Sequence, residues 1–217
     1  MRNALLSHVK RVVVKIGSGV ISTIEGLNEA RITAISEDVC ALLDRGFEVI
    51  MVSSGAVAAG KAQLGIEGRP QTIPQKQAAA AIGQTRIIRE YKEIFNSRGH
   101  NVAQVLLTRD DLSNRRRYLN ARNTMMTLLD YGVTPIVNEN DTVVVEEIRF
   151  GDNDNLSALV TSLVEADMLI IMSDVDGLYD SNPAENPDAE LVPVVERVTQ
   201  KIEAMGGSTN GTLGTGG

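Results

Sequence analysis

Residues 11–19 of this 217-residue chain read RVVVKIGSG, and this stretch decides the fold class. Its first six residues are mostly β-branched and stop at Gly17 and Gly19, which is typical of a buried strand that ends in a turn. Lys15 lies inside the apolar run, where a buried charge is costly unless it faces an anion or a carboxylate. The stretch therefore predicts either a phosphate-binding strand end or a lysine that extends into solvent.

Short apolar runs alternate with helical patterns along the rest of the chain. We expect strands at residues 11–16, 47–52, 102–107, 133–137 and 168–172, and helices at residues 28–45, 57–64, 75–98, 118–131 and 155–165. The strands are apolar on both faces, which is typical of a parallel sheet covered by helices on both sides. The prediction is one α/β domain over residues 1–217, a three-layer αβα sandwich with an open, mainly parallel sheet.

Composition argues against several classes of protein. The chain has 28 acidic and 21 basic residues, only 3% aromatic residues and no tryptophan, which disfavours a nucleic-acid-binding surface. The single cysteine, Cys40, falls in an apolar helical series, and we interpret it as a core residue. No apolar run approaches the roughly 20 residues of a membrane span, and the N-terminus has no signal-peptide pattern. We expect a cytoplasmic protein with no nucleic acid or membrane as partner.

Polar and acidic residues follow the predicted strands, at the sheet edge where doubly wound proteins bind their ligands. They are Ser53, Ser54, Gly55, Asn138, Glu139, Asn140, Asp141, Ser173 and Asp174. Residues 151–155, GDNDN, add a second acidic cluster just before a predicted helix. The two clusters exceed what helix capping requires, so we expect them to bind Mg²⁺, hold a lysine or bind a substrate ammonium group.

Residues 55–61 match the spacing GxxxxGK of a phosphate-binding loop that follows a strand. Ala62 stands where such a loop needs a serine or threonine for Mg²⁺, and the interior AVAA favours a helix. Three interpretations stay open at this point. The segment is a nucleotide-binding loop, a helix start whose free amides face a carboxylate, or an ordinary helix start.

Two other segments also allow several interpretations. Residues 115–117, RRR, are the only dense basic run, and they fit a solvated turn, a phosphate contact or a contact between copies of the chain. Residues 206–217, GGSTNGTLGTGG, are uncharged and rich in glycine. That composition indicates either a flexible linker or a phosphate-binding loop.

Taken together, these motifs resemble the amino acid kinase family over essentially the whole chain. The resemblance rests on VVKIGS (13–18), SGAVAAG (54–60), LLTR (106–109), LNAR (119–122), NEND (138–141), GDNDNLSA (151–158), DGLY (176–179) and GTGG (214–217). NEND and GDNDNLSA are typical of the members that phosphorylate glutamate. The resemblance implies the amino acid kinase fold and ATP-dependent phosphorylation of the side-chain carboxylate of L-glutamate. The product would be L-glutamyl 5-phosphate, in the first step of proline biosynthesis.

The resemblance also implies roles for single residues. The catalytic residues would be Lys15, which neutralises the transferring phosphoryl group, together with Asp154 and Asp152, which orient the lysine and the metal. Glutamate would be bound by Ser54, Gly55, Asn138, Asp141 and Asn153, with Asp141 facing its α-ammonium group. The nucleotide would be bound by Lys15, Gly17, Gly19, Ser173, Asp174, Thr215, Gly216 and Gly217, and the backbone amides of Gly17 and Gly19 would assist Lys15 at the phosphoryl group. ATP would bring Mg²⁺ with it, and no separate metal site is expected.

The same resemblance implies which partners the protein has and how long its domain should be. Proline would be a feedback inhibitor at the glutamate site, the protein would form a homo-oligomer, and glutamyl phosphate reductase would be a further partner. In the family GTGG continues into Met-x-Thr-Lys, then closing strands and a helix, and in many members a PUA domain. The chain stops before that second lysine, so we expect a truncated domain with weak activity or none. The alternatives are a P-loop NTPase using residues 55–61 and a non-catalytic fragment that binds an amino acid.

Overall fold

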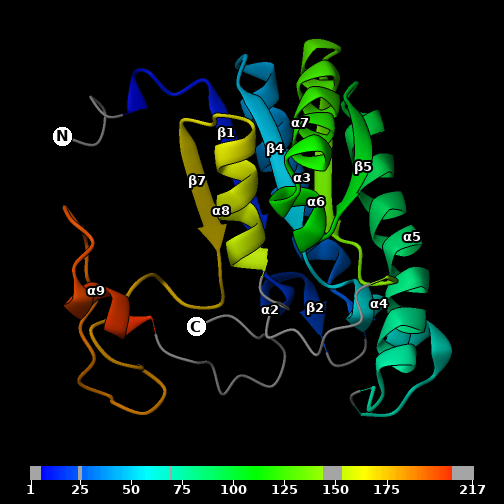
Figure 1. The fold of residues 1–217 in the computed structure, drawn as a ribbon. Coiled ribbons are helices and arrows are strands. Elements are labelled where there is room, and N and C mark those ends of the chain that lie inside the picture. Colours follow the sequence, from blue (N-terminus) through cyan, green and yellow to red (C-terminus); the bar gives the residue numbers. More distant parts are fainter. Residues whose placement is uncertain (1–5, 24–25, 69, 144–152, 207–217) are drawn as a thin grey trace.

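The computed structural model describes residues 6–23, 26–68, 70–143 and 153–206. At its centre lies a five-stranded parallel sheet with the strand order β5-β6-β4-β1-β7 (Figure 1). The strands are β1 (Arg11–Ile16), β4 (Glu48–Ser53), β5 (Asn101–Leu107), β6 (Val133–Glu139) and β7 (Met168–Met172). Each predicted strand is present with ends shifted by at most two residues, and the predicted parallel sheet is confirmed.

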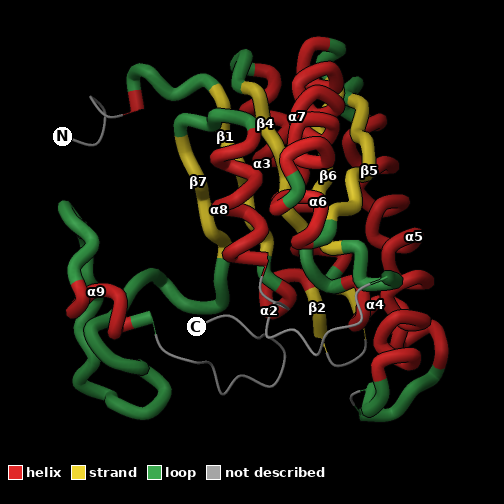
Figure 2. Tube along the Cα trace, in the orientation of Figure 1, coloured by secondary structure: helices red, strands yellow, loops and turns green. Residues whose placement is uncertain are grey.

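Helices cover both faces of this sheet (Figure 2). Helices α3 (Glu29–Asp44) and α5 (Ile73–Ser97) lie on one face, and α7 (Arg115–Asp130) and α8 (Asn153–Leu163) lie on the other. The other helices are α2 (Ser18–Ile21), α4 (Ala56–Leu64), α6 (Arg109–Ser113) and α9 (Gln200–Met205), of which α9 lies apart from the sheet. The short helices α2, α6 and α9 and the hairpin of β2 (Ser22–Thr23) and β3 (Gly26–Leu27) were not predicted. Segments of two to six residues are too short to display a hydrophobic period.

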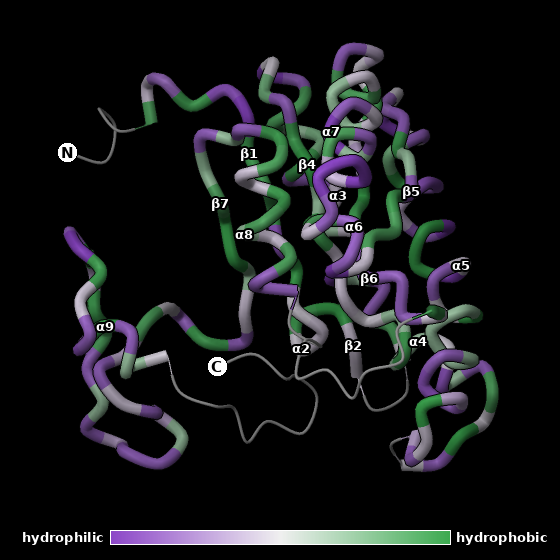
Figure 3. The backbone as a smooth tube through the Cα atoms, viewed as in Figure 1, coloured by the Kyte–Doolittle hydropathy of each residue, from purple (hydrophilic) through white to green (hydrophobic). Residues whose placement is uncertain are grey.

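The side chains of β1 alternate between two cores. Val12, Val14 and Ile16 belong to the core under α3 and α5, whereas Val13 belongs to the core under α7 and α8. Figure 3 shows mostly hydrophobic residues along the central strands and many hydrophilic residues in the helices around them. Successive side chains of a strand point to opposite faces, so Lys15 lies on the face of Val13. The alternation therefore directs Lys15 toward α8.

Helix α3 contains Cys40, which is 2% exposed and belongs to the first core. Burial raises the pKa of its thiol, so the side chain stays protonated and behaves as a small apolar group. The interpretation of Cys40 as a core residue is confirmed.

The basic run at residues 115–117 forms the first turn of α7, and its three side chains are exposed to solvent, as one of the three interpretations expected. The Asn114 side-chain oxygen accepts hydrogen bonds from the backbone amides of Arg116 and Arg117. This N-cap explains the helix start, because asparagine satisfies amides that have no partner within the helix. Arg117 also pairs with Asp111 of α6 at 3.3 Å.

Helices α4 and α5 touch through their backbones at two glycines. A Cβ atom on Gly60 would lie 1.7 Å from the Ala79 carbonyl oxygen, and one on Gly83 would lie 1.7 Å from the Ala56 carbonyl oxygen. Neither position has room for a side chain. The contact fixes α4, and with it the residues that precede α4, against α5.

Replacing Gly60 or Gly83 with alanine is expected to lower the free energy of unfolding by about 1–3 kcal/mol, because the new methyl group forces the two helices apart. Alanine normally stabilises a helix interior by about 1 kcal/mol relative to glycine, so the expected sign is the reverse of the intrinsic preference. Urea denaturation followed by circular dichroism measures the change. An unfolding midpoint equal to or above that of the parent chain would contradict the close contact.

Candidate active site

Lys15 and Asp154 form an ion pair at the carboxyl end of the sheet. The Lys15 ammonium nitrogen lies 2.5 Å from Asp154 Oδ1, and the two side chains are 8% and 28% exposed. Asp154 belongs to the first turn of α8, where the helix dipole stabilises a negative charge. The alternative in which Lys15 extends into solvent is therefore wrong, because Lys15 is buried and faces a carboxylate. The pair holds an ammonium group at a fixed position at the end of β1.

Asn153 joins three elements next to this pair. Its side-chain amide nitrogen lies 2.7 Å from Ser54 Oγ, 2.9 Å from Asn138 Oδ1 and 3.2 Å from the Ser53 carbonyl oxygen. An amide has only two protons, so the three acceptors share them. This hydrogen bonding brings together Ser54, Asn138 and Asn153, which we predicted as site residues from separate motifs. The ends of β4 and β6 and the start of α8 therefore form one polar rim.

Gly55 connects this rim to α4. It is the N-cap residue of α4 with a φ of 94°, a left-handed conformation that favours glycine. A Cβ atom there would also lie 3.1 Å from Ser22 Oγ. The Gly55 side of the helix has no side-chain cap among the described residues, so the first backbone amides of α4 can bind a carboxylate beside Ser54.

The hypothesis of a phosphate-binding loop at residues 55–61 is wrong. Residues 56–64 are the helix α4, so the backbone cannot form the wide loop that such a motif requires. Lys61 lies in the last turn of this helix rather than at its N-terminus. The alanine-rich interior, AVAA, accounts for the difference because alanine has the highest helix propensity.

Two carboxyl groups at the end of β6 have raised pKa values. Burial raises the pKa of Asp141 to about 6. Burial, and then the nearby negative charge of Asp141, raise the pKa of Glu139 to about 7. A desolvated carboxylate gains stability when a cation binds beside it. Asp141 is therefore suited to bind an ammonium group of a ligand.

The ends of β1 and β7 form the other part of the rim. A Cβ atom on Gly19 would lie 3.1 Å from Asp174 Oδ2, so α2, which follows β1, packs directly against the segment that follows β7. The Ser173 hydroxyl donates a hydrogen bond of 3.2 Å to Asp174 Oδ1. Gly19, Ser173 and Asp174, which we predicted to bind a nucleotide, are thus neighbours in space.

The expected role of the Gly17 amide needs a correction. This amide donates a hydrogen bond of 3.1 Å to the Met172 carbonyl oxygen, so it is engaged by the sheet. What Gly17 offers instead is space beside the lysine, because a Cβ atom at this position would lie 3.5 Å from the Lys15 ammonium nitrogen. Four further predicted site residues, Asp152, Thr215, Gly216 and Gly217, lie outside the described residues.

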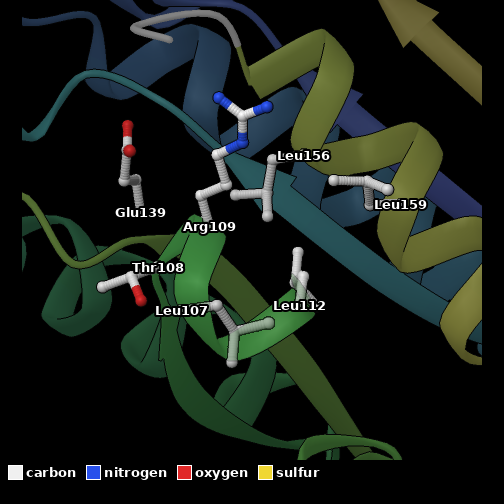
Figure 4. Close-up of a pocket in the computed structure, with 7 residues that line it drawn as sticks. All are labelled: Leu107, Thr108, Arg109, Leu112, Glu139, Leu156 and Leu159. Atoms are coloured by element: carbon white, nitrogen blue, oxygen red, sulfur yellow. The ribbon is translucent and has the colours of Figure 1, made fainter. Parts of the chain in front are cut away.

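A small hollow lies beside the rim, between the end of β5, α6 and α8 (Figure 4). It is lined by Leu107, Thr108, Arg109, Leu112, Glu139, Leu156 and Leu159. Mostly leucine side chains form its wall, and none of the residues predicted to bind glutamate or nucleotide lines it. We therefore assign the candidate site to the polar rim rather than to this hollow.

Our sequence-based reasoning missed the polar residues behind the rim. The Tyr91 hydroxyl lies 3.0 Å from Ser53 Oγ, and the Gln84 side-chain amide donates to the Glu139 carbonyl oxygen at 3.5 Å. Both side chains belong to the buried face of α5, together with Ile87. Polar residues at helical spacing within an apolar face are the signal that could have revealed them.

Two searches of the described residues bear on the class of the site. Within the described ranges there is no group of three or more His, Cys, Asp or Glu side chains placed to hold a metal ion. In the same ranges, no helix has both the length and the apolar character needed to cross a membrane.

Comparison with known proteins identifies the family. The model of the amino acid kinase family matches residues 10–217. The chain belongs to the amino acid kinase family. Over its whole length this amino acid kinase is 65% identical to a protein named glutamate 5-kinase from Syntrophotalea carbinolica and 60% identical to one from Geobacter metallireducens. It spans 58% of the length of each of these relatives, so both continue well beyond the matched region.

Proposed function

We propose that this amino acid kinase transfers the γ-phosphoryl group of ATP to the side-chain carboxylate of L-glutamate, which gives L-glutamyl 5-phosphate. The observation that carries the proposal is the adjacency of Asn153 and Asp154 in the first turn of α8. Asn153 assembles the amino-acid side of the rim, and Asp154 holds Lys15 for the phosphoryl group. The names of the relatives support the same activity.

The chemistry requires charge neutralisation rather than a general base. An oxygen of the glutamate carboxylate attacks the γ-phosphorus, and the bond from that phosphorus to the bridging oxygen of ADP breaks. The carboxylate is already ionised, so no proton has to be removed from the nucleophile. The Lys15 ammonium group reduces the repulsion between the two anions, and Asp154 keeps it in place. Mg²⁺ that arrives with ATP supplies further positive charge.

The rim offers complementary groups for the two ends of glutamate. We assign the α-ammonium group to Asp141, whose carboxylate is desolvated by burial and would be stabilised by a bound cation. The Ser54 hydroxyl and the free amides at the start of α4 are donors for a carboxylate. Asn153, through its hydrogen bonds to Ser54 and Asn138, fixes the ends of β4 and β6 relative to each other. The nucleotide is assigned to the side formed by Gly19, Ser173 and Asp174, and to residues 215–217.

Further parts of the proposal rest on the family resemblance alone. They are feedback inhibition by proline, assembly into a homo-oligomer, and a place in proline biosynthesis next to glutamyl phosphate reductase. Titration with proline by calorimetry tests the first of these. Heat of binding that glutamate abolishes by competition would support a shared site.

The proposed activity is tested by ADP release in the full-length protein with L-glutamate and, as a control, L-aspartate. Aspartate has the same charged groups but is shorter by one methylene, so its carboxylate cannot occupy the same position. We expect ADP release that depends on L-glutamate and is at least about tenfold slower with L-aspartate. ADP release at the same rate without any amino acid would contradict the proposal.

Glutamate affinity is expected to depend on pH through Asp141. Its raised pKa of about 6 means that the free protein carries a neutral Asp141 at lower pH, whereas the bound ammonium group requires the carboxylate. Affinity should therefore increase as pH rises, and be about tenfold weaker at pH 5 than at pH 7.5. Calorimetry over this range measures the effect. The variant Asp141→Asn should bind weakly at both values, and a wild-type affinity that is independent of pH would contradict the assignment.

A further inference from the structure

Helix α5 makes hydrogen bonds to two strand ends that carry the proposed glutamate site. It packs on one face of the sheet, in the core that contains Val12 and Ile136, whereas α8 packs on the other. Its buried face is otherwise apolar, with Ile87 midway between Gln84 and Tyr91. A buried polar group in such a face needs a specific partner, and both residues find theirs at the carboxyl end of the sheet.

Tyr91 supports the end of β4. Tyr91 and Ser53 are 0% and 1% exposed, and their hydroxyl oxygens lie 3.0 Å apart. Burial raises the pKa of Tyr91 to about 12, so its hydroxyl keeps its proton and remains available as a donor. Ser53 in turn accepts a hydrogen bond from Asn153 through its carbonyl oxygen, and it precedes Ser54. The Tyr91 hydroxyl thus contacts the residue directly before Ser54, which belongs to the rim.

Gln84 supports the end of β6 in a similar way. It is 8% exposed, its amide nitrogen donates to the Glu139 carbonyl oxygen at 3.5 Å, and its amide oxygen accepts a hydrogen bond of 3.2 Å from Gln104 of β5. Glu139 is the last residue of β6 and lies between Asn138 and the loop that carries Asp141. Gln84 therefore ties β5 and β6 together next to the proposed ammonium site.

The contacts that place the phosphoryl and nucleotide side use other elements. Lys15 is held by Asp154 of α8, and Gly17 is held by the Met172 carbonyl oxygen of β7. By contrast, the backbone contact between Gly60 and Gly83 attaches α4, with Gly55 at its start, to α5. The amino-acid side thus has three connections to α5.

We infer that α5 positions the amino-acid half of the site, with Gln84 and Tyr91 as positioning residues that govern affinity for L-glutamate but not for the nucleotide. The inference deepens the proposed function and rests on it for the identity of the amino acid. Neither side chain touches the substrate in this proposal. Each acts through a strand end, Tyr91 through Ser53 and Gln84 through Glu139.

The test compares Tyr91→Phe and Gln84→Met with the control Ile87→Val. The first two remove hydrogen bonds from the buried face of α5, whereas the control removes one buried methylene group from the same face. Calorimetry measures binding of L-glutamate and of a non-hydrolysable ATP analogue. We expect both polar variants to weaken glutamate binding about tenfold while nucleotide affinity stays within about twofold of the parent value. The control should change neither affinity.

Hydrogen exchange measured by mass spectrometry provides a readout that does not depend on the substrate. Peptides over residues 53–58 and 136–143 should exchange faster in the two polar variants than in the parent chain and the control. Unchanged exchange there, or an equal loss of glutamate and nucleotide affinity, would overturn the inference. If the parent chain binds no glutamate, the proposed function fails, and the exchange of these peptides alone decides whether α5 positions the strand ends.

Discussion

Replacement of Lys15 by methionine is expected to lower the turnover number for phosphoryl transfer at least about 10²–10³-fold, the effect of removing one preorganised charge from a transition state. Lys15 is buried, and Asp154 fixes its ammonium group at a distance of 2.5 Å. Methionine keeps the length and apolar character of the side chain. Steady-state ADP release in the full-length protein measures the loss, and calorimetry should find glutamate affinity nearly unchanged.

The matched control for this variant is Lys61→Met. Lys61 would be the phosphate-binding lysine if residues 55–61 formed a nucleotide loop, but it lies in the last turn of α4. We expect turnover and nucleotide affinity within about twofold of the parent values. A large loss in Lys61→Met together with near-normal turnover in Lys15→Met would reverse the assignment of the two lysines.

Asn153→Asp is expected to have the second largest effect. The substitution replaces an NH₂ group by a carboxylate oxygen opposite three acceptors, the Ser53 carbonyl, Ser54 Oγ and Asn138 Oδ1. The Ser54 hydroxyl can turn and the Asn138 amide can flip to present a donor, but the Ser53 carbonyl oxygen cannot, so the end of β4 should separate from α8. Glutamate affinity should fall at least about 30-fold, equivalent to about 2 kcal/mol.

The control for this variant is Asn155→Asp, which adds the same charge two residues later at an exposed position of α8. It should bind glutamate with an affinity close to that of the parent chain. The glutamate affinity of Asn153→Ala should lie between those of Asn153→Asp and Asn155→Asp, because this variant removes the donor without adding a repulsive oxygen. Equal affinities of Asn153→Asp and Asn155→Asp, measured by calorimetry at neutral pH, would show that Asn153 does not assemble the rim.

The strands and long helices could be predicted from the sequence because their signals are local. Residues 11–16 and 47–52 are apolar runs that end at small or polar residues, and the sheet contains strands there within one residue. The strand order could not be predicted, because periodicity carries no information about which strands are neighbours. The match of residues 55–61 to a nucleotide loop gave a wrong alternative, because these residues form the helix α4. The spacing of the glycines and the lysine takes no account of the helix propensity of the residues between them.

The candidate site could be predicted in part. Lys15, Ser54, Asn138 and Asn153 lie in separate motifs. The rule that ligands bind at the carboxyl ends of parallel strands placed Ser54 and Asn138 at one edge. The role of Asn153 came from the family resemblance. Gln84 and Tyr91 were missed because their role depends on how α5 lies on the sheet, which no local pattern specifies. The Gly17 amide was misjudged for the same reason, since its partner is the Met172 carbonyl oxygen on a strand 155 residues later in the chain.

The most direct test is to trap the acyl phosphate product. Hydroxylamine attacks an acyl phosphate at the carbonyl carbon, releases phosphate and leaves a hydroxamate that can be identified by mass spectrometry. With ATP, Mg²⁺ and L-glutamate, we predict that the full-length protein forms the glutamyl 5-hydroxamate in step with ADP, and that Lys15→Met forms almost none. Release of ADP with no hydroxamate would contradict phosphorylation of the glutamate side chain.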